Sequence, residues 1–134
     1  MMINNYSKAG LIKPIKGKKY TREQIIQMLV ICSMKGVLSL GEIKDIFDTL
    51  YSGQAFDENA LSCCYKNAVS AQQKSREELA ELLNDIFNCG SREEQFSSLM
   101  AVCAMADSLS ELAKRMAAEY FPPIEAGGKS KKKD

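Results

Sequence analysis

Two consecutive apolar segments dominate the hydrophobic pattern of the chain between residues 20 and 53. In the second segment the apolar residues recur three and four positions apart, which is the spacing of one face of an α-helix. They are Ile43, Ile46, Phe47, Leu50 and Tyr51. The first segment is more apolar, and more than one of its faces is covered by Ile25, Ile26, Leu29, Val30 and Cys32. The pattern predicts two helices, of which the first is central in a small bundle.

Both predicted helices begin with the residues of a capping box. In this motif a Ser or Thr hydroxyl accepts a hydrogen bond from the N–H of the third helical residue, whose own side chain reaches back to the cap. Thr21 with Gln24 and Ser39 with Glu42 have the required spacing. Gly36 is expected to take the left-handed conformation that ends many helices. A short turn should therefore connect the two helices.

The N-terminal residues 1–12 predict a short helix that ends at Gly10. An isolated helix of this length is marginal in water, so it has to pack on another part of the protein. Residues 13–20 place Pro14 and Gly17 among lysines, and they predict a tight loop or a small hairpin.

The pattern becomes helical again after residue 54, where Asp57 can cap a new helix. Apolar positions fade over residues 70–78 and resume at Leu79. This fits either one long helix with a solvated middle or a second helix capped by Ser75, and the single helix is favoured. No strand pattern of any length is present.

A last helix is predicted to begin at the capping pair Ser91 and Glu94 and to continue to residue 120. Its apolar positions are Phe96, Leu99, Met100, Cys103, Leu112, Met116 and Tyr120. These positions and the stripe over residues 79–87 exceed what one antiparallel helix pair can cover. We therefore expect residues 54–121 to form a helical dimerisation region that makes a homodimer, followed by a disordered basic tail over residues 122–134.

A chain of 134 residues with 46% hydrophobic content fits a single domain, and its net charge of +1 argues neither for nor against nucleic acid. The charge is unevenly placed, because residues 1–20 contain five lysines and no acidic residue. The N-terminal end is therefore the better candidate for an anionic partner.

The chain has five cysteines, which is an odd number. It has no secretory signal and no apolar run near the length of a membrane span. This predicts a cytoplasmic protein with no membrane contact. Cys32, Cys64 and Cys103 are expected to act as small hydrophobic residues. Because the chain has no histidine and no CxxC pair, neither a metal site nor a cofactor is expected, although an unusual all-cysteine site remains the alternative.

Catalysis finds little support in the sequence. The chain has no histidine for general base work, no Gly-rich phosphate loop, and no Ser or Cys nucleophile with a recognisable partner. Its carboxylate clusters lie on polar helix faces, where they serve solvation. The protein is therefore not expected to be an enzyme.

Residues 2–50 resemble the winged-helix DNA-binding domain of the MerR family of transcription regulators. The recognition helix of that family typically ends in an isoleucine, a polar or basic residue, tyrosines and then Gly-Leu-Ile, and here residues 3–12 read INNYSKAGLI. A wing with a proline and basic residues follows, matched by Pro14, Lys16, Lys18 and Lys19. In the family an aromatic residue then leads into a helix, and Tyr20-Thr21 matches it here. The next helix of the family opens with Ser-Leu and an EIK triplet, and residues 39–44 match this opening. The sequence resembles more closely an uncharacterised bacterial family, the domain of unknown function numbered eighteen thirty-six. The members of that family look like MerR relatives with a shortened wing.

The resemblance implies an incomplete winged helix-turn-helix-like module over residues 1–53, because the family has another helix before the recognition helix and this sequence has no residues for it. Asn4 stands where the MerR pattern usually has arginine, and Asn5 where it has the first tyrosine. The resemblance implies that Asn4, Asn5, Tyr6 and Lys8 face the groove or the backbone of duplex DNA. The wing residues Lys16, Lys18 and Lys19 would hold phosphates. The alternatives are a core contact for Tyr6 and a solvated loop for the lysines.

These expectations combine into an all-α protein in which the incomplete module precedes a C-terminal helical bundle region. Its expected function is that of a DNA-binding transcription regulator, with weak binding to duplex DNA in the absence of an upstream helix. The alternative is a non-enzymatic helical interaction or dimerisation module that has lost DNA binding.

Overall fold

The computed structural model of the chain describes residues 2–88 and 90–125. Within these residues the chain forms five helices and no strand, so the expected all-α class is confirmed. The helices are α1 (Met2–Lys8), α2 (Arg22–Met34), α3 (Leu40–Ser52), α4 (Glu58–Phe87) and α5 (Arg92–Tyr120). The expected basic tail lies almost entirely outside the described residues, which end at Glu125.

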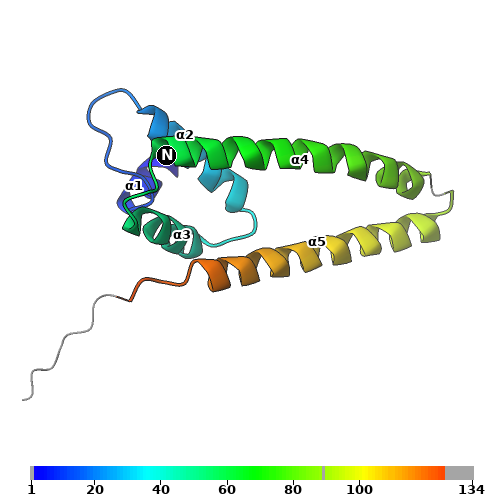
Figure 1. Cartoon of the computed structure of the whole chain (residues 1–134). Helices are drawn as coiled ribbons and strands as arrows, with labels where there is room; N and C mark the ends of the chain where they lie inside the picture. The colour runs from blue at the N-terminus through cyan, green and yellow to red at the C-terminus, as the bar shows by residue number, and fades with distance from the viewer. Residues whose placement is uncertain (1, 89, 126–134) are drawn as a thin grey trace, which may run out of the picture.

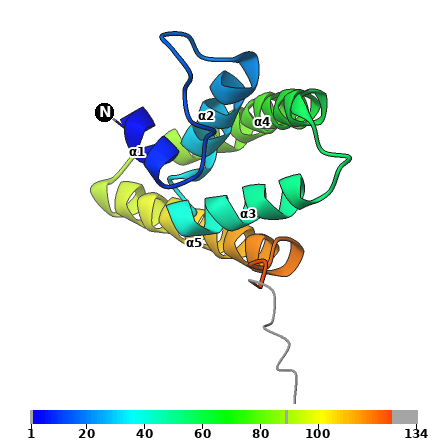
Figure 2. The same ribbon diagram turned by 90° about the vertical axis from the view of Figure 1, so that its left-hand side faces the viewer.

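The three short helices gather at one end of the molecule, and the two long helices extend away from them to a turn at the far end (Figure 1). In the turned view α3 lies beside α5, and α2 lies beside α4 (Figure 2). The loop between α1 and α2 projects from the end opposite to the α4–α5 turn (Figure 1). The molecule therefore has a helical base, formed by α1, α2, α3 and the adjoining ends of α4 and α5, and a long two-helix arm.

The helix starts follow the predicted capping residues. Capping boxes open α2, α3 and α5, with Thr21, Ser39 and Ser91 as the caps. The Asp57 carboxylate accepts a hydrogen bond from the N–H of Ala60 at the start of α4. Because α4 runs without interruption from residue 58 to residue 87, the expectation of one long helix is confirmed.

The left-handed conformation expected at Gly36 was wrong. The described residues with positive φ are Gly10, at +73°, and Gly17, at +91°. At the end of α2 the N–H groups of Val37 and Leu38 both donate to the carbonyl oxygen of Met34, at 3.0 and 2.9 Å. This tightened last turn pairs the carbonyl without a left-handed residue.

The core of the base combines helices that are far apart in the sequence. Its buried apolar residues are Tyr6, Leu11, Ile12, Ile26, Ile31, Leu38, Ile43, Ile46, Phe47, Leu61 and Ala117. Leu61 belongs to α4 and Ala117 to α5, so the first turns of α4 and the last turns of α5 complete the core of residues 1–53. The base is thus larger than the N-terminal segment alone.

The arm leaves most of its apolar side chains in solvent. Ala117 is the buried residue of α5, whereas the exposed large apolar residues of this helix are Phe96, Leu99, Met100, Met105, Leu109, Leu112, Met116 and Tyr120. Within the described part of the chain, α5 is also long and apolar enough to cross a membrane by length and composition, which is weak evidence taken alone. The expectation that no segment approaches such a length therefore does not hold for α5 by this measure.

The cap of α3 provides a stability test. We expect Ser39→Ala to lower the free energy of unfolding by about 1 kcal/mol, because the Ser39 hydroxyl accepts the hydrogen bond of the Glu42 N–H at 3.2 Å. Urea unfolding followed by circular dichroism measures this difference. The control is Ser97→Ala, at an exposed position inside α5, which should be neutral or slightly stabilising. Equal losses in the two variants would contradict the role of the cap.

Candidate nucleic-acid interface

Exposed lysines mark the end of the molecule where the loop between α1 and α2 projects. Lys8 ends α1, and the loop contributes Lys13, Lys16, Lys18 and Lys19, all of them exposed. The exposed face of α1 adds Asn4 and Asn5. Six of the seven side chains expected to contact DNA are therefore exposed on α1 and the loop that follows it.

Tyr6 is the exception, because only 5% of it is exposed and it belongs to the core of the base. Leu11 and Ile12, which follow the short helix, are buried as well. These side chains attach a helix that would be marginal on its own. Of the two alternatives for Tyr6, the structure shows the core contact, and we leave this residue out of the candidate interface.

The loop between α1 and α2, residues 9–21, is called the lysine loop below, and two residues of the first turn of α2 hold its start. The Gln24 side chain, which is buried, donates through Nε2 to the carbonyl oxygen of Lys13 at 3.0 Å. Its Oε1 accepts the Thr21 N–H at 2.9 Å, so one side chain both closes the capping box and anchors the loop. Glu23 lies 3.7 Å from the ammonium of Lys13 and offsets its charge. The loop therefore leaves the base at a fixed point.

A polar network continues from this anchor to α3. The Tyr51 hydroxyl donates to Glu23 Oε1 at 3.0 Å and accepts from Gln27 Nε2 at 3.1 Å. Burial raises the pKa of Tyr51, so its hydroxyl keeps its proton as a donor at neutral pH. The ring packs edge-on against Phe56, with 5.4 Å between centroids. Through Glu23 the network makes the position of the loop depend on the packing of α3.

Gln27 is the least satisfied member of this network. It is 4% exposed, and its Oε1 has no hydrogen-bond partner in the structure. Sequence reasoning missed both buried glutamines. The spacing of Gln24, Gln27 and Ile31, three and four positions apart, places them on one helix face and could have indicated them.

Comparison with protein families gives a match over the part of the chain that contains this polar network. Residues 1–68 match the family described as Domain of unknown function (DUF1836). The chain belongs to this DUF1836 family. The match covers α1, the lysine loop, α2, α3 and the first turns of α4. Comparison with curated proteins found no match, and neither did comparison with solved structures.

The charge on the lysine loop of the DUF1836 protein is only partly offset. Within the described residues Lys13 pairs with Glu23, whereas Lys16, Lys18 and Lys19 form no salt bridge. Lys13, Lys16 and Lys19 also border an open cavity of about 370 Å³ between the loop and the first turn of α2. An anion that approached this end would meet several cations at once.

Lys44, from the EIK triplet of α3, contributes little to this charge. Its ammonium donates to the Asp48 carboxylate one turn further along the helix, and this hydrogen bond raises the pKa of Lys44. The Lys44 side chain also passes close to Gly10, where an added Cβ would lie 3.4 Å from its Cε. Lys44 therefore lies beside the turn after α1, and its charge is already paired.

Four of the five cysteines of the DUF1836 protein lie among the described residues. Cys32, Cys63, Cys64 and Cys103 are free and exposed, so the expected burial of Cys32, Cys64 and Cys103 among apolar residues is not seen within one chain. Among the described residues no three His, Cys, Asp or Glu side chains gather as metal ligands. That Cys63 and Cys64 are reduced and metal-free stays a prediction, which a zinc determination on protein purified without added metal would check.

The loop anchor can be tested by proteolysis. We expect Gln24→Leu to speed trypsin cleavage after Lys16, Lys18 and Lys19, because the loop loses its hydrogen bond at Lys13. One hydrogen bond contributes roughly 0.5–1.5 kcal/mol, so the open population and the cleavage rate should rise roughly two- to tenfold. Mass spectrometry of the early fragments gives the rates.

The matched control for this experiment is Thr21→Ala. It removes the hydroxyl of the same capping box but keeps the Gln24 side chain that donates to Lys13. Its cleavage rate in the loop should stay near that of the wild type. If the two variants accelerate cleavage equally, the cap holds the loop and the Gln24 anchor does not.

Proposed function

We propose that this DUF1836 protein is a cytoplasmic DNA-binding transcription regulator whose base is a MerR-like winged-helix module. In this proposal α1 is the recognition helix and the lysine loop is a shortened wing. The observation that supports it best is the set of unpaired Lys16, Lys18 and Lys19 on a loop anchored by buried polar side chains, next to the exposed face of α1.

The two parts of this surface would have different roles. Lysines recognise phosphates as point charges, so the loop would supply affinity and fix the register on the duplex without reading the sequence. Asparagine can form two hydrogen bonds with adenine in the major groove. Asn4 and Asn5 on α1 are therefore the candidates for sequence preference, and Lys8 would contact the backbone.

The affinity of residues 1–134 for DNA should be low. A recognition helix depends on a preceding helix that sets its angle and crosses the phosphate backbone, and among the described residues no helix precedes α1. Nonspecific binding has dissociation constants of about 10⁻⁴ to 10⁻⁶ M at physiological salt. A longer protein with an upstream helix should bind more tightly and with sequence preference.

The exposed apolar residues of the arm favour a second candidate function. A helical interaction or dimerisation module needs an apolar surface to bind its partner, and α5 provides one. In this alternative the base keeps the shape of the winged-helix module without binding DNA. The two candidates differ in whether the protein binds any DNA in a salt-dependent way.

Fluorescence anisotropy with a labelled duplex tests the DNA proposal. We expect binding that weakens steeply between 50 and 200 mM salt, and a large loss of affinity in the triple variant Lys16→Glu, Lys18→Glu, Lys19→Glu. Because each lost phosphate contact lowers the logarithmic salt slope by about 0.9, the triple variant should lower it by roughly 2.7. Asn4→Ala or Asn5→Ala should instead change the preferred sequence in a selection from a random pool.

The control for the triple variant carries the same charge change elsewhere. Lys66→Glu, Lys74→Glu, Arg76→Glu reverses three exposed cations of α4, away from the lysine loop. Its salt slope should remain near that of the wild type. Equal effects of the two triple variants, or no salt-dependent binding by a protein extended upstream of Met1, would leave the interaction module as the better account.

A further inference from the structure

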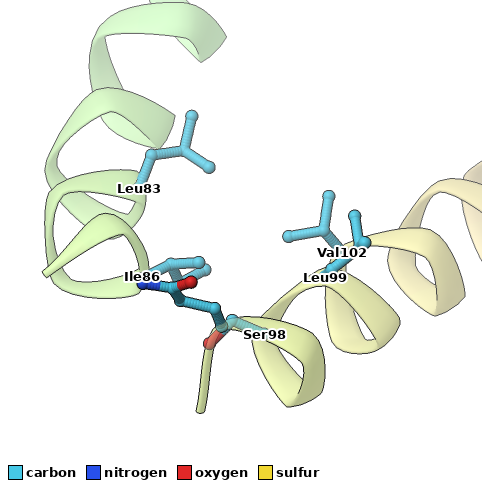
Figure 3. A pocket seen from close by; sticks show the side chains of 6 residues that line it. Leu83, Ile86, Ser98, Leu99 and Val102 are labelled. Atoms are coloured by element: carbon cyan, nitrogen blue, oxygen red, sulfur yellow. The ribbon is translucent and has the colours of Figure 1, made fainter. Parts of the chain in front are cut away.

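Two cavities of about 370 Å³ lie at opposite ends of the molecule and differ in their chemistry. The cavity near the turn between α4 and α5 is lined mainly by the apolar side chains of Leu83, Ile86, Leu99 and Val102 (Figure 3). The other cavity, called the loop cavity below, lies between the lysine loop and the first turn of α2 and has charged walls. Ligand sites in proteins begin at roughly 300 Å³, so the loop cavity has the size of a site for one small molecule.

Cations dominate the walls of the loop cavity. Three lysines and one glutamate border it and leave these walls with a net charge of +2, namely Lys13, Lys16, Lys19 and Glu23. The glutamate is already engaged, because its Oε2 lies 3.7 Å from the Lys13 Nζ and its Oε1 accepts the Tyr51 hydroxyl at 3.0 Å. In the described part of the chain neither Lys16 nor Lys19 forms a salt bridge. The loop cavity therefore favours an anionic ligand.

The start of α2 adds a second source of positive potential to the same cavity. Thr21, Glu23 and Gln24 border the loop cavity. The first N–H groups of an α-helix have no acceptor within the helix, and the helix dipole favours a negative charge near them. The capping box uses the Gln24 N–H, which donates to the Thr21 hydroxyl at 3.2 Å, but the helix offers no acceptor for the N–H groups of residues 22 and 23. An anion in the cavity would thus lie near the positive end of α2 as well as beside the lysines.

The backbone that carries these lysines is held in place without a ligand. The buried Gln24 side chain donates to the carbonyl oxygen of Lys13 at 3.0 Å and holds the loop start against α2. Pro14, another wall residue, has a φ angle that its ring locks. The chain then bends at Gly17 and Lys18, where Gly17 takes the φ of +91° that favours glycine. Ligand binding would therefore require little ordering of the loop, which lowers its entropic cost.

We propose that the loop cavity binds a small free molecule that carries two or more phosphate groups. Lys16 and Lys19 contact its phosphates, since a lysine ammonium binds a phosphate as a point charge. Lys18 lies in the same loop but outside the walls of the cavity. A compact ligand therefore depends on Lys16 and Lys19 and not on Lys18, whereas duplex DNA along the loop can use all three. The inference goes beyond the proposed function and does not rest on it, because the ligand is not DNA.

Isothermal titration calorimetry of the whole chain with inorganic pyrophosphate, at low and constant ionic strength, tests the loop cavity. We expect saturable binding of one pyrophosphate per chain. Lys16→Gln and Lys19→Gln should each weaken it roughly five- to tenfold, because each removes a charged donor. The matched control is Lys18→Gln, which changes an exposed lysine of the same loop and should bind like the wild type. Absence of saturable binding, or an equal loss in Lys18→Gln, would overturn the proposal.

A further variant should gain affinity, which a damaged fold would not produce. Glu23→Gln removes the negative charge from the wall, and its new amide oxygen can still accept the hydrogen bond of the Tyr51 hydroxyl. Pyrophosphate should bind roughly two- to fivefold more tightly to this variant. Binding that is unchanged or weaker, with the helix content by circular dichroism unchanged, would place the anion outside the loop cavity and contradict the proposal.

Fluorescence anisotropy with a labelled duplex separates the two sources of phosphate. Pyrophosphate binding without salt-dependent DNA binding would support the free ligand and contradict the proposed function. If the protein instead binds the duplex through Lys16 and Lys19 but not Lys18, and does not bind pyrophosphate, the cavity holds phosphates of the DNA backbone. That result would overturn the free ligand and leave the proposed function in place.

Discussion

The fold depends on closing a small core from helices that cannot stand alone. The three helices of the base have 7, 13 and 13 residues, and isolated helices of this length are marginal in water. Ile31 and Ile43 are fully buried in a core that Leu61 of α4 and Ala117 of α5 also join. The long helices therefore stabilise the base with a few turns at their ends. The remaining turns, which form the arm, contribute little to this core and can serve another interface.

The same constraint explains how a short basic loop keeps a defined position. Loops usually vary in conformation because few contacts hold them. Here Gln24, Glu23 and Tyr51 connect the loop start at Lys13 to α2 and α3. The packing of these helices therefore also restricts the position of the loop. Burial of polar groups is costly when they are unpaired, and the unpaired Oε1 of Gln27 shows that the network carries such a cost. A polar network kept at this cost is easier to understand as a support for the exposed lysines than as a source of stability alone.

Much of the secondary structure could be predicted from the sequence because the signals are local. Capping boxes need only residues three apart, and all three that were expected occur in the structure. The burial of Tyr6 and the exposure of Cys103 could not be decided in this way. They depend on which helix faces other segments cover, and the local pattern of apolar residues does not show this. The polar anchor of the loop was missed for a related reason, since a glutamine in a helix is ordinarily a surface residue and only its tertiary partner distinguishes it.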